Sequence, residues 1–383
     1  MSTNAQGDAP QLTPQAPARP PRIALWDNAR FLLIVLVVIG HSISTVRTDS
    51  TLTFGLYTYI YLFHMPAMIF LSGFFSRPEV SPKAIKSTLQ LIVVWLMWEG
   101  IWALIHLGVD DKAPGDRFLV SPAWTLWFLV SLATMRILLP YLAMLRRPLL
   151  LAVVLALVSG LVPAMGTEFS AARTLSFMPF FVAGWLASSR GWLTHDWFTK
   201  PTARVRAAGW GLLVAIGCLL AFIPNLYEVW RVDTWLTWRD DDAWLLRNAP
   251  IDEWHAPSEA AGMATGLGIT LLLLVIATAM TLALLLVVPR GHSRITRWGT
   301  RTLFVYLLHA PIIWTLRETG AIDAIYGLGL GGVALLLTLS IALAVLLSTN
   351  LVARVTRPFI EPRITWLFPR DRQGVANGQK SGR

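Results

Sequence analysis

The sequence predicts an all-α protein that crosses a membrane about ten times, with both termini in the cytoplasm. Hydrophobic residues make up 55% of the 383 residues and charged residues only 14%, and the mean hydropathy is +0.57. A water-soluble domain carries about 25% charged residues. Apolar runs long enough to cross a hydrocarbon core of about 30 Å recur along the chain. These observations exclude an ordinary soluble enzyme, and the single cysteine, Cys218, excludes an intramolecular disulfide.

The elements follow in a simple order. Residues 1–24 are rich in proline and poor in apolar side chains, so we expect a flexible cytoplasmic tail without a secretory signal. Residues 25–355 form the predicted transmembrane domain, whose longest connection is an extracytoplasmic loop at 227–263, and a basic cytoplasmic tail follows at 356–383. The predicted spans are 26–46, 54–75, 88–108, 123–145, 148–165, 171–188, 207–226, 264–289, 301–317 and 327–353.

The charge distribution predicts the orientation. With the N-terminus inside, the cytoplasmic segments hold 23 Lys and Arg against 6 Asp and Glu, and the outer segments hold 8 against 15. Because short cytoplasmic loops retain Lys and Arg, this asymmetry favours an even number of spans and a multi-pass protein of the cell (inner or plasma) membrane. The basic residues are divided among separate segments, so no nucleic-acid partner is expected.

Five ionisable groups within the spans are predicted to lie at one depth. Counting 1.5 Å per residue from the nearest cytoplasmic basic residue places each of them about 12 to 20 Å into the membrane. A charge at that depth needs a partner or a water-filled cavity. Taken singly, His64 and His309 are also explained as interhelical hydrogen-bonding residues, and Glu99 and Arg136 as a buried ion pair, whereas the motif around His41 sets it apart. The five groups are His41, His64, Glu99, Arg136 and His309.

Two of the histidines precede a proline by two residues, at Pro66 and Pro311. A proline inside a helix removes one backbone hydrogen bond, and such breaks are tolerated where water or other helices satisfy the freed carbonyl. We therefore expect a wet pocket, lined by broken helices, that gathers His41, His64 and His309 and opens toward the cytoplasm.

Several motifs occur in an order that resembles the acyltransferase 3 family of membrane acyltransferases, in the branch that contains fucose 4-O-acetylase. Arg30, ten intervening residues and His41 match the opening of that family. Phe31 departs from it, because a small residue is expected there. The further matches lie at 63–75, 124–129, 178–185 and 306–311, so the resemblance covers nearly the whole hydrophobic chain.

The resemblance implies an O-acetyltransferase that moves an acetyl group from cytoplasmic acetyl-CoA to a carbohydrate hydroxyl, such as that of a polysaccharide, glycolipid or nodulation-type oligosaccharide. An imidazole is suited to take the hydroxyl proton near neutral pH, so His41 is the candidate general base, and Glu99 is the candidate group that orients its ring. The candidate substrate-binding residues are His64, Arg136 and His309. Guanidinium groups bind phosphates bidentately, so the candidate donor-binding residues are Arg30, Arg77, Arg294 and Arg297. No metal is expected.

Other interpretations stay open. A secondary transporter also has many spans and ionisable groups near the midplane, although the two halves of the chain show no convincing repeat. A catalytically idle scaffold is a third interpretation. The five tryptophans at 230–254 fit interfacial anchors somewhat better than a lid over a glycan. The triplet at 240–242 fits a solvated turn better than a metal site, because three consecutive carboxylates cannot all face one ion.

Overall fold

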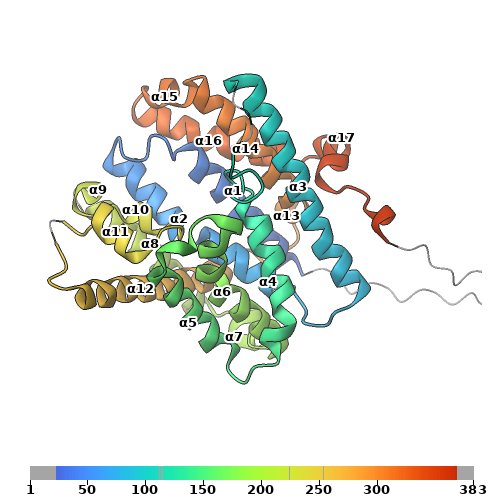
Figure 1. Cartoon of the computed structure of the whole chain (residues 1–383), viewed down its shortest axis with the longest axis horizontal. Helices are drawn as coiled ribbons and strands as arrows, with labels where there is room; N and C mark the ends of the chain where they lie inside the picture. Colours follow the sequence, from blue (N-terminus) through green and yellow to red (C-terminus); the bar gives the residue numbers. More distant parts are fainter. Residues whose placement is uncertain (1–22, 112, 114, 224, 253, 369–383) are drawn as a thin grey trace, which may run out of the picture.

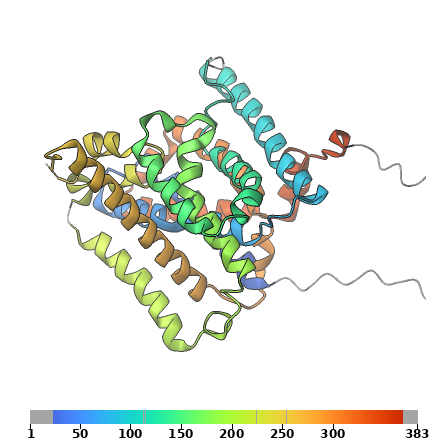
Figure 2. The ribbon, with the colours of Figure 1, turned by 60° about the horizontal axis from the view of Figure 1, so that its bottom comes forward.

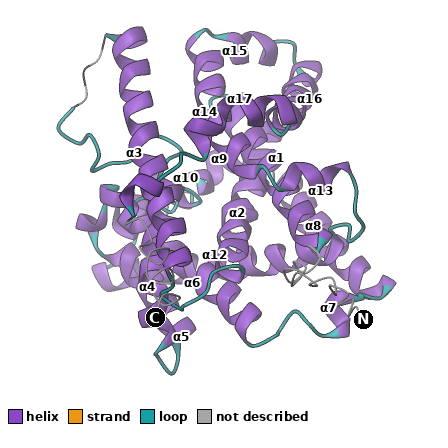
Figure 3. Ribbon diagram, turned by 90° about the vertical axis from the view of Figure 1, so that its right-hand side faces the viewer, coloured by secondary structure: helices purple, strands orange, loops and turns teal. Residues whose placement is uncertain are grey.

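The computed structural model describes residues 23–368 except 112, 114, 224 and 253. Within this part of the chain every regular element is a helix, and the only β pairing is an isolated bridge between Trp230 and Ile251. Figure 3 shows the helices and the loops that join them. The predicted all-α fold class is confirmed. Residues 1–22 and 369–383 of the two predicted tails lie outside the described residues.

Each predicted span contains one principal helix. Six of these helices, α1, α2, α3, α8, α12 and α16, are long and apolar enough to cross a membrane. The apolar runs therefore predict helices of the right kind in the right places, with ends that differ by a few residues. The ten helices are α1 (Ala24–Ser42), α2 (Thr51–Phe74), α3 (Pro82–Asp110), α4 (Trp127–Ala143), α5 (Pro148–Leu161), α6 (Ala171–Ser189), α8 (Ala203–Phe222), α12 (Glu259–Val287), α14 (Thr302–Glu318) and α16 (Leu330–Leu347).

The short helices lie in the connections between these ten. They are α7 (Asp196–Thr199), α9 (Leu226–Val229), α10 (Val232–Trp235), α11 (Asp242–Asn248), α13 (Arg294–Gly299) and α15 (Ala321–Tyr326), with short 3-10 turns at Pro163–Met165, Glu168–Ser170 and Thr365–Leu367. The predicted outer loop 227–263 is thus a folded segment that contains α10 and α11. We call the end of the molecule that carries this segment the loop face, and the opposite end, where α1 begins, the Arg30 face.

The helices that carry the three histidines pack together. α1 contacts α2, α14 and α16 (Figure 1), whereas the long helix α3 leans away at one edge of the molecule (Figure 2). α2 and α14 continue through Pro66 and Pro311 as helices, so the expected breaks are wrong. A proline removes only its own N–H from the backbone ladder, and the remaining turns hold each helix together.

The crossing of α2 and α6 depends on two glycines. A Cβ added to Gly73 would lie 2.0 Å from the carbonyl oxygen of Phe181, and one added to Gly184 would lie 2.0 Å from that of Phe70. The two backbones are therefore in direct contact, which only glycine permits. This contact fixes the height of α2, and with it the height of His64.

The start of α1 is held by a polar contact with the chain around α13. The side-chain amide of Asn28 donates to the carbonyl oxygens of Pro289, at 2.8 Å, and Gly291, at 3.1 Å. It also accepts a hydrogen bond of 2.7 Å from the Thr296 hydroxyl. Phe31 packs on Trp298 with ring centroids 5.2 Å apart, so the large residue at this position fills space against α13.

The tenth predicted span, 327–353, is too long at its C-terminal end. α16 stops at Leu347, and the hydroxyl of Thr349 caps a separate helix, α17 (Asn350–Ile360). Three apolar side chains of α17, those of Leu351, Val355 and Phe359, recur every four residues and are exposed, while Ile360 is buried. This spacing gives the helix one apolar stripe. α17 therefore has the pattern of a helix that lies on a membrane surface.

Candidate functional site

His41 and His309 lie side by side. Their ring centroids are 5.3 Å apart, although the residues belong to α1 and α14. The His41 ring also contacts the edges of Trp124, at 5.1 Å, and Tyr61, at 6.4 Å. Tyr61 in turn packs against His64 at 4.7 Å. The three imidazoles that the sequence predicts at one depth therefore form one cluster.

Two of the three rings are fixed to their own helices. The Nδ1 atom of His64 lies 2.8 Å from the Ile60 carbonyl oxygen, and that of His309 lies 2.9 Å from the Val305 carbonyl oxygen. A carbonyl only accepts, so each Nδ1 carries the hydrogen, and in the neutral ring each Nε2 is an acceptor. The His309 Nε2 is buried and has no hydrogen-bond partner among the described residues. The cluster thus presents a basic nitrogen beside His41.

A cavity of about 240 Å³, which we call the histidine cavity, contains the rings of His41 and His64. Its wall includes Arg47, Leu236 and Arg239, which lie toward the loop face. Among the described residues, none at the Arg30 face lines it. The cavity thus extends from the histidines toward the loop face, and not toward the Arg30 face that the charge distribution predicts to be cytoplasmic.

Glu99 is near the cluster but does not hold an imidazole. Its Oε1 accepts hydrogen bonds from the Trp95 indole, at 2.8 Å, and from the backbone N–H of Ala123, at 2.9 Å. Among the described residues no histidine hydrogen-bonds with it. Because Ala123 precedes Trp124, Glu99 positions the wall that touches His41.

Arg136 lies in a different place. Its guanidinium donates to the Ser87 hydroxyl, at 3.1 Å, and lines a second cavity, of about 550 Å³, together with Arg77 and Lys83. Height along a helix does not determine the direction in which a side chain points, and Arg136 faces α3. The structure therefore separates Arg136 from His41 and groups it with a predicted donor-binding residue.

The remaining predicted donor-binding residues lie at the Arg30 face. Arg294 and Arg297 are exposed on α13, which packs against the start of α1. The Arg30 guanidinium lies 4.3 Å above the Phe75 ring and 3.3 Å from Asp27. These cations gather at one end of α1, and His41 lies at the other.

Sequence reasoning missed several residues of the histidine cavity. Four arginines from the outer ends of spans or from the loop segment converge on it or beside it. Short loops on the outer side of a membrane contain few Lys and Arg. Four arginines at predicted outer positions were therefore the sequence signal that could have pointed to this cavity. Sequence reasoning also missed Tyr306, whose hydroxyl donates to the Thr125 carbonyl. The four arginines are Arg47, Arg173, Arg239 and Arg317.

The structure of the loop segment differs from what the sequence predicts. Trp235 and Trp238 are 3% and 7% exposed, so they are core residues and not interfacial anchors. Asp241 caps α11 by accepting from the backbone of Trp244 at 2.9 Å. A solvated turn is the wrong interpretation for Asp242, which is 4% exposed.

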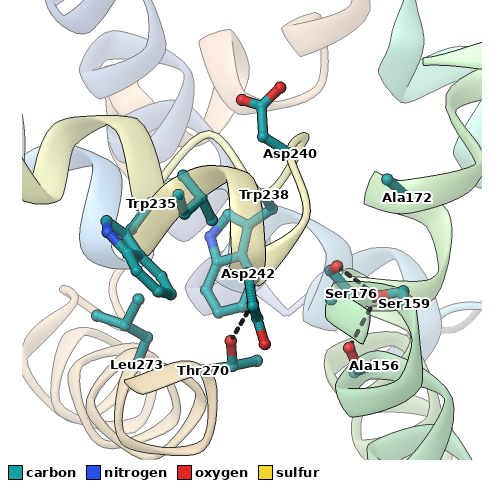
Figure 4. A pocket seen from close by; sticks show the side chains of 12 residues that line it. Ala156, Ser159, Ala172, Ser176, Trp235, Trp238, Asp240, Asp242, Thr270 and Leu273 are labelled. Carbon is teal, nitrogen blue, oxygen red and sulfur yellow. Dashed lines mark hydrogen bonds between the residues drawn. The ribbon is translucent and has the colours of Figure 1, made fainter. Parts of the chain in front are cut away.

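Asp242 lies in a tight socket between α5 and α12 (Figure 4). A Cβ added to Gly160 would lie 2.6 Å from Oδ1, and one added to Gly266 would lie 2.5 Å from the Asp242 Cβ, so glycines make the room. Thr270 donates a long bond of 3.4 Å to Oδ1, and Oδ2 has no partner among the described residues. Burial raises the pKa of Asp242 to about 6.

Asp233 shows the opposite electrostatics in the same segment. It is 1% exposed, and burial alone would raise its pKa. Arg231 and Arg47 bind its carboxylate at 2.9 and 2.8 Å and hold the pKa below the usual range. In the part of the chain that the structure describes, no group of three or more His, Cys, Asp or Glu is arranged to hold a metal ion.

A family model described as an acyltransferase domain, of the acyltransferase 3 family, matches residues 23–349. The chain belongs to this family. It is a multi-pass membrane acyltransferase, and the match runs through all ten principal helices.

Two curated proteins are similar to parts of this family member. The nodulation protein NolL of Mesorhizobium japonicum is 34% identical over 88 residues, which cover 21% of this chain and 24% of the relative. NolL of Sinorhizobium fredii is 27% identical over 122 residues, which cover 28% of this chain and 33% of the relative. The chain thus spans only about a quarter to a third of these relatives. No solved structure matches.

Proposed function

We propose that the protein transfers an acetyl group from acetyl-CoA to a hydroxyl group of a carbohydrate, with His41 as general base. The observation that carries the proposal is that His41, which lines the histidine cavity, lies beside the buried His309, with ring centroids 5.3 Å apart. Acyl transfer to a hydroxyl needs a base where the hydroxyl attacks. The family membership supplies the reaction class, and the cavity supplies a place for the acceptor.

In the proposed reaction the acceptor oxygen attacks the thioester carbonyl while His41 takes the hydroxyl proton. The tetrahedral intermediate then collapses, the carbon–sulfur bond breaks, and the imidazolium returns the proton to the leaving thiolate. The products are an acetyl ester and free CoA, so the imidazole ends the cycle neutral.

His309 takes the positioning role that the sequence assigns to Glu99. Its Nδ1 is held by Val305, and its unpartnered Nε2 is an acceptor next to the His41 ring. An acceptor on the second nitrogen of a catalytic imidazole orients the ring and stabilises the imidazolium. Hydrogen bonds of this kind are often long before substrate binds. Glu99 affects His41 only indirectly. It binds the backbone N–H of Ala123, and the next residue, Trp124, contacts the His41 ring.

The proposed substrates approach from opposite ends of α1. The phosphates of acetyl-CoA bind the arginines of the Arg30 face, since guanidinium groups are suited to phosphate. The acceptor binds in the histidine cavity, whose wall extends to the loop face. By the positive-inside rule the Arg30 face is cytoplasmic, so the acetyl group leaves the cytoplasmic donor for an acceptor on the outer side.

The test uses the full chain in proteoliposomes with radiolabelled acetyl-CoA and a glycan and glycolipid extract from host cells. His41→Ala is expected to lower transfer about 10²-fold or more, because a positioned base contributes that much. His106→Ala is the matched control, since His106 packs against Trp102 and Trp314 away from the cavity lining. Transfer by His41→Ala at the wild-type rate would refute the assignment.

The same vesicles separate this proposal from a secondary transporter. An acyltransferase leaves label in an acetyl ester, which mass spectrometry of the glycans detects. A transporter leaves label in the vesicle lumen with no new ester. Loss of an acetyl ester from surface glycans in cells without the gene is the expected result in vivo.

A further inference from the structure

The wall of the histidine cavity carries an unusual balance of charge. The described residues that line it include three arginines and two histidines and no carboxylate. We call the three arginines, Arg47, Arg173 and Arg239, the arginine rim. They come from three separate parts of the chain, namely the connection after α1, the start of α6 and the loop segment. The fold therefore brings positive charge to one place beside His41.

Two members of the arginine rim have counter-ions. Arg47 pairs with Asp233 at 2.8 Å, and Arg239 pairs with Asp240 at 3.1 Å. Asp233 is shared, because Arg231 binds it as well. These two pairs leave the net charge of the rim positive.

Arg173 makes no ion pair among the described residues, and Asp240, the carboxylate whose charge acts on it, is paired with Arg239. Its Nε donates to the carbonyl oxygen of Thr237 at 3.1 Å, and its guanidinium lies 4.9 Å above the Trp127 ring. The terminal nitrogens make no described hydrogen bond. A partly buried guanidinium is costly without an opposite charge bound to it. The two terminal nitrogens of the Arg173 guanidinium are thus available to bind an anion bidentately.

Aromatic rings stand beside this cation. Tyr57 and Tyr61 stack with centroids 3.8 Å apart, and Trp124 lies under the guanidinium of Arg317 at 4.4 Å. Arg317 has no ion pair among the described residues either, and it donates to the backbone of His41. A cavity lined by aromatic rings, with a few placed polar groups, is typical of a site for a small organic ligand.

We propose that the acceptor is an anionic carbohydrate whose negative group binds Arg173 while a neighbouring hydroxyl faces His41. This rests on the function proposed above and narrows its substrate class. The negative group is the carboxylate of a uronic acid or the phosphate of a sugar phosphate, both of which match a guanidinium bidentately. A neutral sugar leaves Arg173 without an ion pair. The donor phosphates have their own arginines at the other end of α1.

Direct binding to the full-length protein in detergent tests the proposal without requiring catalysis. The probes are glucuronate, glucose 1-phosphate and neutral glucose, and the readout is the fluorescence of the tryptophans in the cavity wall. At least one anionic probe is expected to bind about tenfold or more tightly than glucose, as a charged hydrogen-bonded contact provides. Arg173→Gln abolishes this preference, and Arg173→Lys retains part of it because the charge remains.

Arg117→Gln is the matched control, because Arg117 is exposed and pairs with Glu168 outside the cavity. It should keep the wild-type preference. Equal binding of glucose and both anions, no binding of either anion, or an unchanged preference in Arg173→Gln would each overturn the proposal. So would a loss of CoA binding in Arg173→Gln with anion binding intact, because the rim would then serve the donor.

The two proposals fail in distinguishable ways. Acetyl transfer to a neutral glycan without any anion preference contradicts the anionic acceptor and leaves the acetyltransferase intact. Anion-selective binding without any acetyl transfer contradicts the acetyltransferase instead.

Discussion

Replacing Asp242 by Asn should stabilise the protein, and the gain should depend on pH. The carboxylate has an ordinary pKa of 3.8, and burial in its glycine-lined socket raises this to about 6. A shift of about 2 units corresponds to about 3 kcal/mol at 1.36 kcal/mol per unit. Because the folded protein holds the proton more tightly than the unfolded chain, Asp242 favours folding at low pH. This contribution is lost as the pH rises from about 4 to about 6.

Asparagine keeps the shape and cannot ionise. The variant is therefore expected to be more stable than wild type by up to about 3 kcal/mol above pH 7, with the difference shrinking to near zero at about pH 4. Denaturant titrations in detergent micelles, followed by tryptophan fluorescence at several pH values, measure the difference in free energy of unfolding. Exposed Asp49 provides the control, because Asp49→Asn changes the same chemical group on the surface.

Two results would refute this reasoning. A gain that is equal at pH 4 and pH 7.5 would show that ionisation is not its cause. A loss of stability at pH 7.5 would show that the buried charge is not the dominant cost at this position.

Three further perturbations test the packing and the cluster. Gly184→Ala should destabilise the protein by about 1–3 kcal/mol in the same titrations, since the added methyl group collides with the α2 backbone. Gly211→Ala is the control and should be neutral or slightly stabilising, because the space around Gly211 is open. Asn28→Ala should cost about 2–4 kcal/mol by removing three hydrogen bonds at the start of α1, and an unchanged unfolding midpoint would contradict that. His309→Gln should lower kcat about 10²-fold with the KM for acetyl-CoA unchanged. It should retain more activity than His309→Ala, because the glutamine side chain keeps a hydrogen-bond acceptor. Equal rates for the two variants would argue against a role of His309 in orienting His41.

The sequence predicts the helices well because the physical cause is simple. A segment that crosses about 30 Å of hydrocarbon must be long and apolar, and that signal is local. The rise of 1.5 Å per residue also predicts the height of His41, His64 and His309. These three do meet in the structure.

Rotation about the helix axis is the quantity that the sequence does not reveal. A helix that is apolar on all sides has no face that sequence reasoning can turn toward the core. Glu99 and Arg136 do not join the three histidines, because the first binds Ala123 and the second binds Ser87. The arginine rim was missed for a related reason, because its members meet only after the loop segment folds back over α1, α2 and α6.

The burial of α1 along its length has a mechanical consequence. His41 lies eleven positions after Arg30, which is about three turns and about 16 Å, so the two side chains project from nearly the same side of the helix. The helix thus fixes the distance between the two ends of the proposed substrate path. One inserted residue would turn the ring by about 100° and displace it by about 1.5 Å, whereas a conservative substitution along the rod would change neither. The distance between the two ends of the path is therefore set by the length of α1 as well as by its side chains.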